Sequence, residues 1–400
     1  MNSQKINIFM AFYWLSFIWI VPGTFFLLFF KDGIEIVNHE ISLATYETII
    51  IGSISTIIFY ILLYFLCLYL DKKNKNWLTF NQKSGSEPSS SNRNKYLVFF
   101  QALFLAIHLL YIGISNIPIL QALDGNFWEA NKLRASLVSG EIKYIPYFFV
   151  LVDFFCKLLP IYLFLSKAKK IYIISSFIIL LIYLIYDVQK APLIIYLAAF
   201  YLSFWGGRIN KKTIIYMSLL SILAFYSYSI TKNIDDTYLI TLKLLNRIFI
   251  LQHQVLYLTI EYGHSNILNI FHNTPLIPNF LDLPIRYDIA IMEKLGYDFS
   301  VNINMNGIFL AEAYSILGVI FPLSIFFVLG FMVLFYNVIV YFTLGNKEFK
   351  ISVLFVWLFF FFPINNSFTS LFFSYRNILM WVSIIIAYLL IFFKIKSKKY

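Results

Sequence analysis

The sequence predicts an all-α, polytopic integral membrane protein, and two observations predict it: the composition and the length of the apolar runs. Hydrophobic residues make up 60% of the 400 residues, aromatic residues 20% and charged residues only 13%. A water-soluble domain could not cover so much apolar surface, so lipid is the expected solvent. A helix needs about 20 apolar residues to cross a bilayer, and many runs of about that length follow one another along the chain.

Ten such runs predict about 10 transmembrane helices in one domain, residues 1–400. The expected spans are 8–30, 46–70, 96–115, 144–165, 171–187, 191–206, 213–231, 318–343, 351–370 and 377–393. The first run ends without the small-residue cleavage motif of a signal peptide, so we expect it to remain as a membrane anchor. Cys67 and Cys156 both lie in apolar runs, which predicts neither a disulfide framework nor a cysteine-rich metal site.

Lys and Arg collect in alternate segments between the spans, and this bias predicts the orientation. With the N-terminus in the cytoplasm, the inner segments hold 19 of the 31 Lys and Arg residues. These are one in 1–7, six in 71–95, three in 166–170, three in 206–212, two in 344–350 and four in 394–400. We therefore expect both termini in the cytoplasm, and we assign the net charge of +11 to topology and not to nucleic-acid binding.

Two segments outside the spans are long. The inner segment 71–95 is rich in Ser and Lys and is predicted to be a flexible cytoplasmic loop. The outer segment 232–306 is too apolar to be disordered, and residues 243–261 carry their polar side chains on one arc at helical spacing. We expect an amphipathic helix there that rests at the membrane surface with its polar face turned inward. The prolines that follow it form turns that present Arg286 and Asp288.

The outer segments carry five cations on separate parts of the chain. These are Arg134 in the loop 116–143, Lys190 in the turn after the fifth span, Arg247 and Arg286 in 232–306, and Arg376 before the last span. A diphosphate needs several such donors, and the planar fork of Arg matches phosphate oxygens. Taken singly, an outer cation is more often in contact with water or lipid headgroups than with substrate.

Three ionisable residues lie within or close to a span. Glu312, at the outer end of the eighth span, is a candidate catalytic base, with a structural role as the alternative. Asp153 and Lys157, four residues apart in the fourth span, can pair on one helix face, either as a structural pair or as the lining of a cavity. The outer histidines have no metal-ligand spacing, and GxSxG, HExxH and P-loop motifs do not occur, so we expect metal-independent chemistry without a cofactor.

Three segments resemble stretches of the O-antigen and capsular polysaccharide polymerases, the Wzy-type oligosaccharide repeat-unit polymerases. The segment 134–140 resembles their Arg-to-Gly stretch in an outer loop, and 187–192 resembles their turn of a basic residue before an apolar span, with Lys190 where Arg is commoner. The segment 306–318 resembles the one that closes their large outer loop. The related O-antigen ligases carry a His near this third segment, where this chain has Asn302, Asn304 and Asn306, which favours a polymerase.

The resemblance implies a glycosyltransferase that joins undecaprenyl-diphosphate-linked oligosaccharide repeat units at the periplasmic face of the bacterial inner membrane. It implies that the five outer cations hold substrate diphosphate and that Glu312 or Asp288 activates the acceptor hydroxyl. Expected partners are membrane lipids, a chain-length regulator and a flippase. The alternatives are a lipid-linked oligosaccharide flippase or other secondary transporter, which Asp153 and Lys157 favour, and a structural partner in glycan export.

Overall fold

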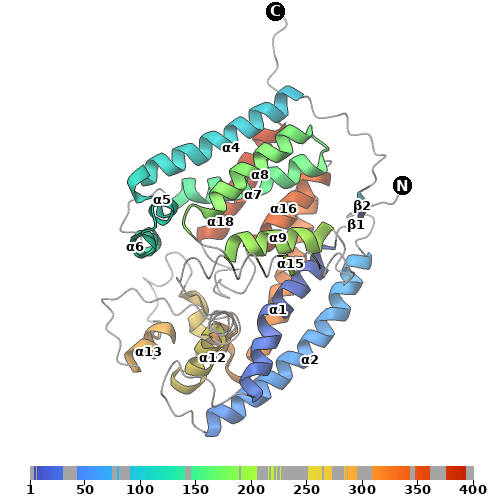
Figure 1. The fold of residues 1–400 in the computed structure, drawn as a ribbon. Coiled ribbons are helices and arrows are strands. Elements are labelled where there is room, and N and C mark those ends of the chain that lie inside the picture. The colour runs from blue at the N-terminus through green and yellow to red at the C-terminus, as the bar shows by residue number, and fades with distance from the viewer. Residues whose placement is uncertain are drawn as a thin grey trace, which may run out of the picture.

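The structure is a computed structural model that describes most of the helical part of the chain. The described residues are 4–5, 7–29, 43–73, 79–80, 91–139, 146–188, 191–204, 215, 218, 219, 222, 226, 251–263, 265–272, 283–285, 287–294, 309–342, 347–360 and 375–392. Nearly all of them are helical (Figure 1). Two strands of two residues each, β1 (Gln4–Lys5) and β2 (Thr79–Phe80), pair antiparallel. The predicted all-α class is confirmed.

Helices occupy the expected spans wherever the structure describes them. They are α1 (Ile8–Phe29), α2 (Leu43–Lys73), α4 (Ser91–Ile112), α7 (Pro146–Leu165), α8 (Lys170–Ile185), α9 (Ala191–Phe204), α15 (Ser324–Phe342), α16 (Lys347–Phe360) and α18 (Tyr375–Phe392). Within the described residues, five helical stretches are long and apolar enough to cross a membrane: Ile8–Phe25, Tyr46–Lys73, Asn92–Ile112, Phe148–Leu165 and Phe309–Ile339. These stretches identify an α-helical membrane protein. The expected span 213–231 lies almost wholly outside the described residues.

The ends of the helices lie on two faces of the molecule, which we call the first and the second face. On the first face, the start of α1 meets the end of α2, because the backbone N–H groups of Phe9 and Met10 donate to the Asp71 carboxylate at 3.3 and 2.8 Å. The Asn7 N–H donates to the Ser203 carbonyl at 3.2 Å, which brings the end of α9 to the same place. The helices α2 and α4 also extend into both ends of the predicted loop 71–95.

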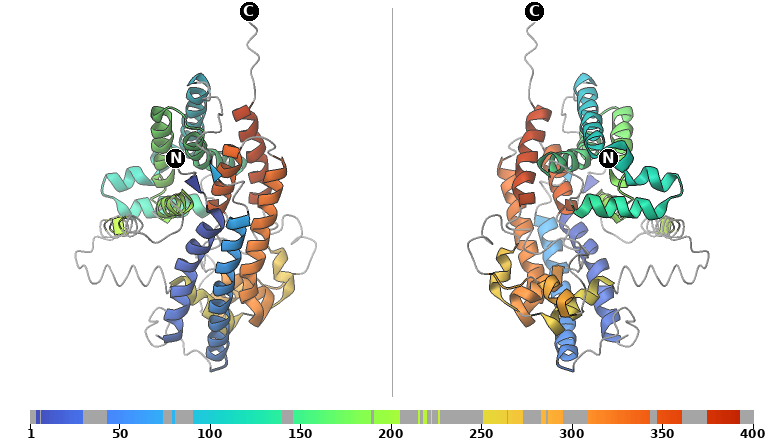
Figure 2. Two further views of the ribbon diagram at one scale, coloured as in Figure 1. Left: turned by 90° about the vertical axis from the view of Figure 1, so that its right-hand side faces the viewer. Right: turned by 90° about the vertical axis from the view of Figure 1, so that its left-hand side faces the viewer.

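The starts of α4 and α16 and the end of α18 lie on this first face too. The Arg93 guanidinium, in the first turn of α4, lies 5.3 Å from the ring centroid of Phe392, at the end of α18. Phe392 also contacts Phe349, at the start of α16, with ring centroids 5.7 Å apart. The start of α4 and the end of α18 lie close together in Figure 1, and Figure 2 shows the fold from two further sides.

The second face gathers the short helices, on the side of the molecule away from the start of α1 and the start of α4 (Figure 1). They are η2 (Ile114–Asn116), α5 (Pro118–Leu123), α6 (Phe127–Ser139), α12 (Leu251–Tyr262), η4 (Ile267–Phe271), α13 (Tyr287–Lys294) and α14 (Phe309–Leu317). The Ile119 N–H donates to the Tyr186 carbonyl at 3.0 Å, which ties α5 to the end of α8. Beside the far end of α1, a His253 ring nitrogen lies 3.0 Å from the Ile20 carbonyl.

A break separates α14 from α15 and marks where the eighth expected span enters this face. The 3-10 turn η6 (Gly318–Leu323) contains Ile320 with non-helical φ and ψ and Pro322, which has no N–H to donate. Gly318 has φ +61°, a conformation that glycine adopts without steric cost. The helical stretch therefore begins at Phe309, nine residues before the expected start at 318, and Glu312 lies in the separate helix α14.

Candidate functional site on the second face

The structure describes the side chains of two of the seven predicted site residues. Arg134 is half-buried in α6, and Glu312 is 5% exposed in α14. Asp288 and Arg376 lie in α13 and α18, but their side chains are outside the described part. Lys190, Arg247 and Arg286 lie outside the described residues altogether. The convergence of the five cations therefore stays a prediction.

Arg134 and Glu312 belong to different groups of second-face helices. The helix α6 packs on α5, whereas α14 packs on α12, η4 and η6. The helix α6 also exposes Trp128, and the Lys132 ammonium lies 5.6 Å from the centroid of that ring. Exposed aromatic and basic side chains side by side are typical of a membrane–water interface, so α6 is well placed to meet lipid headgroups.

Glu312 belongs to a hydrogen-bonded group that we call the α14 cluster: Glu312, Ser315, Asn269 and His272. The Ser315 hydroxyl donates to the Glu312 carbonyl at 2.8 Å, and the Asn269 side-chain amide donates to the Ser315 carbonyl at 2.7 Å. The Asn269 side-chain oxygen lies 3.2 Å from Nε2 of His272. The bond from Asn269 to the Ser315 backbone carbonyl holds η4 against α14. It brings the Asn269 amide, and with it the His272 imidazole, to the helix that carries Glu312.

Glu312 is buried in a helix most of whose residues are buried, with only Tyr314 and Leu317 partly exposed. Every residue from Phe309 to Ala313 is buried, and so are Ser315 and Ile316. Burying an ionisable group is costly, so a chain that keeps one in a packed apolar helix usually uses it. Within the described residues, no group of three or more His, Cys, Asp or Glu side chains comes together as metal ligands.

The described part of the predicted amphipathic helix, α12, does not rest on a surface. His253 and Tyr257 from the predicted polar arc are buried, and so are Leu256 and Ile260 from the apolar arc. The helix packs against α14, α13 and α2, which cover both arcs. Burial raises the pKa of the Tyr257 hydroxyl above its usual range, so this group is neutral at physiological pH. The polar arc is turned inward at His253 and Tyr257, as expected, whereas the burial of Leu256 and Ile260 means that protein also covers the apolar arc at these positions.

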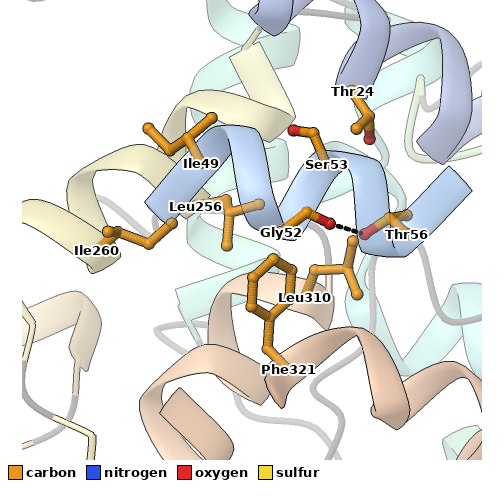
Figure 3. Close-up of a pocket in the computed structure, with 9 residues that line it drawn as sticks. All are labelled: Thr24, Ile49, Gly52, Ser53, Thr56, Leu256, Ile260, Leu310 and Phe321. Carbon is orange, nitrogen blue, oxygen red and sulfur yellow. Dashed lines mark hydrogen bonds between the residues drawn. The ribbon is translucent and has the colours of Figure 1, made fainter. Parts of the chain in front are cut away.

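A small hollow lies between α1, α2, α12, α14 and η6 (Figure 3). It is lined by Thr24, Ile49, Gly52, Ser53, Thr56, Leu256, Ile260, Leu310 and Phe321. The Thr24 and Thr56 hydroxyls donate to carbonyls of their own helices at 2.7 Å. The hollow has room for about one water molecule, so it is a packing feature and not a place for a sugar.

A second polar group, which we call the α7 cluster, lies among α4, α7 and α8: His108, Asp153, Lys157 and Tyr183. Lys157 and Asp153 form the ion pair that their spacing predicts, with side chains only 8% and 15% exposed. His108 of α4 is fully buried and contacts the ring of Tyr183 at a centroid distance of 6.0 Å. Sequence reasoning missed His108, although a lone histidine within an apolar run was the available signal.

Comparison with known proteins found no match for this chain. The chain matches no protein-family model, no curated protein and no solved structure.

Proposed function

We propose that the chain is an O-antigen-type polymerase, a metal-independent glycosyltransferase that joins undecaprenyl-diphosphate-linked oligosaccharide repeat units. The observation that carries the proposal is the enclosed carboxylate of Glu312 in α14, on the second face and within the segment 306–318 that resembles the polymerases. In this proposal the second face is periplasmic, the protein lies in the bacterial inner membrane, and both termini are cytoplasmic.

The distribution of charge over the two faces supports this orientation. Helix ends on the first face carry Lys72 and Lys73, Arg93 and Lys95, and Lys347 and Lys350. Positive residues collect on the cytoplasmic side of membrane proteins. The end of α9 lies on the first face and α12 on the second, an arrangement that is compatible with the expected span 213–231 between them.

The proposed reaction is a substitution at the anomeric carbon of the growing glycan. The acceptor hydroxyl oxygen forms the new bond to that carbon, and the bond to the diphosphate oxygen breaks with its electron pair on the leaving group. Glu312 or Asp288 takes the hydroxyl proton. The role of Arg134 and the other outer cations is to stabilise the charge that develops on the departing diphosphate.

Deleting the gene and examining the surface glycan tests the proposal. We expect lipid carrying single repeat units in place of a ladder of lengths. Complete loss of surface glycan would instead indicate a flippase.

Complementation then tests the carboxylate. We expect Glu312→Gln to leave single repeat units, whereas Glu293→Gln, an exposed glutamate in α13 on the same face, restores the ladder. Immunoblots of the membrane fraction ensure that both variants are present in equal amount. A full ladder from Glu312→Gln, or from both Arg247→Ala and Arg286→Ala, contradicts the residue roles.

The α7 cluster favours a second candidate, a lipid-linked oligosaccharide flippase or another secondary transporter. Ionisable groups enclosed between membrane helices are typical of transport pathways. The deletion experiment above separates this candidate from the polymerase.

A further inference from the structure

The interface of α4, α7 and α8 encloses ionisable groups that the proposed polymerase reaction does not use. His108 has no exposed surface, and among the described residues neither of its ring nitrogens has a hydrogen-bond partner. Asp153, which forms an ion pair with Lys157, acts electrostatically on His108. A buried ion pair is often no more stabilising than apolar residues of similar volume, and an unpartnered imidazole is costly. Packing alone therefore does not account for this set of residues.

We propose that His108, together with Asp153, Lys157 and Tyr183, forms a proton-binding site that takes up its proton from the second face. His108 lies four residues before the end of α4 at Ile112, so it is about 6 Å from that end of the helix. The ring of Tyr186, one residue past the end of α8, has its centroid 5.3 Å from that of His108. Asp187 follows, is half-buried and acts electrostatically on Tyr186, so a carboxylate lies beside this ring.

The groups that face His108 come from two neighbouring helices. From α7 it is Asp153, which acts on His108 electrostatically and in turn interacts with Cys156 and Lys157 of its own helix. From α8 they are Tyr183, whose hydroxyl hydrogen-bonds Asp153, and Tyr186 with Asp187 beside it. Asp153 is the anion that acts on His108, and Lys157 forms an ion pair with the same carboxylate.

The binding step is a simple proton transfer. A hydronium ion at the second face gives up its proton, the lone pair of a His108 ring nitrogen forms the new N–H bond, and a water molecule remains. Before this step the cluster is neutral, because Asp153 and Lys157 form an ion pair, and after it the cluster carries one positive charge. The Asp153 carboxylate then interacts with His108 of α4 as well as with Lys157 of α7. Lys157 also lies over the Tyr183 ring, 5.9 Å from its centroid, and so connects α7 to α8. Proton binding at His108 therefore changes contacts among α4, α7 and α8.

The test is a histidine-selective nitrogen NMR titration of the full-length protein in lipid nanodiscs. The chain has five histidines, and His108→Gln identifies the signal of interest by its loss. We expect that signal to change reversibly from the neutral to the imidazolium pattern between about pH 8 and pH 4. A His108 signal that keeps one protonation state over this range overturns the proposal, and the wild-type protein alone decides this point.

Two variants test the assigned neighbours. Asp153→Asn removes the anion and should move the midpoint of the His108 titration to lower pH by about one unit. Lys157→Met removes the competing cation and should move the midpoint to higher pH by a similar amount. Lys170→Met, exposed at the first-face end of α8, is the matched control and should leave it unchanged. Shifts of the same sign in both cluster variants overturn the assignment. The readout is the imidazole itself, so the result is independent of polymerase activity.

Discussion

Replacing Gly52 by alanine should force α2 and η6 apart. A Cβ atom at position 52 would lie 2.6 Å from both Cε1 and Cζ of Phe321, whose ring is 2% exposed and points at Gly52 (Figure 3). Carbon atoms do not approach this closely, so either the ring or the helix must move. Adding a methyl group to a packed core costs about 1–3 kcal/mol, and close approach through small residues is how membrane helices pack. We expect the free energy of unfolding to fall by that amount.

Reversible unfolding of the purified protein in mixed micelles, titrated with sodium dodecyl sulfate, measures this change. Gly330→Ala in α15 is the matched control, because no atom lies within 4 Å of its added Cβ. It should be neutral or stabilise by up to about 1 kcal/mol through helix propensity. Phe321→Leu should rescue Gly52→Ala, since leucine ends at Cδ and the Phe321 Cδ1 atom is 3.9 Å from the added Cβ, an ordinary contact.

The packing is refuted if Gly52→Ala behaves like Gly330→Ala. It is also refuted if the double variant shows no coupling, that is, if the two single costs simply add. A coupling of about 1 kcal/mol is the expected value for two residues in direct contact.

Three further predictions use the same unfolding measurement. Asp71→Ala removes the acceptor of two backbone N–H groups at the start of α1 and should lower the free energy of unfolding by about 1–2 kcal/mol. Asp71→Asn keeps one acceptor oxygen and should lower it less. Equal costs would contradict the capping role. Gln101→Leu breaks three hydrogen bonds that join α4 to α7 and α8. At about 0.6 kcal/mol each, their loss should lower the free energy of unfolding by about 2 kcal/mol. No change would argue against this buried junction. Gly23→Ala places a Cβ 2.1 Å from the His253 ring and should destabilise more than Gly330→Ala; a neutral effect would mean that α12 does not pack on α1 there.

The sequence by itself determined the membrane helices and where most of them begin and end. The helix α8 (Lys170–Ile185) differs from its expected span 171–187 by two residues at most, because lipid requires the backbone to hydrogen-bond within each segment. The Asp153–Lys157 pair followed from spacing along one helix, which is also a local property. The charge bias between segments predicts an orientation in the membrane, which stays a prediction.

Tertiary structure decided how the helices contact one another. It enclosed α12 on both arcs, separated α14 from α15, and brought His108 of α4 next to the charged pair of α7. It also left Arg134 and Glu312 in different groups of helices, which their positions in the sequence do not reveal. The physical reason is that a helix in lipid is specified by its own residues, whereas its neighbours are chosen by how side chains from distant segments fit together.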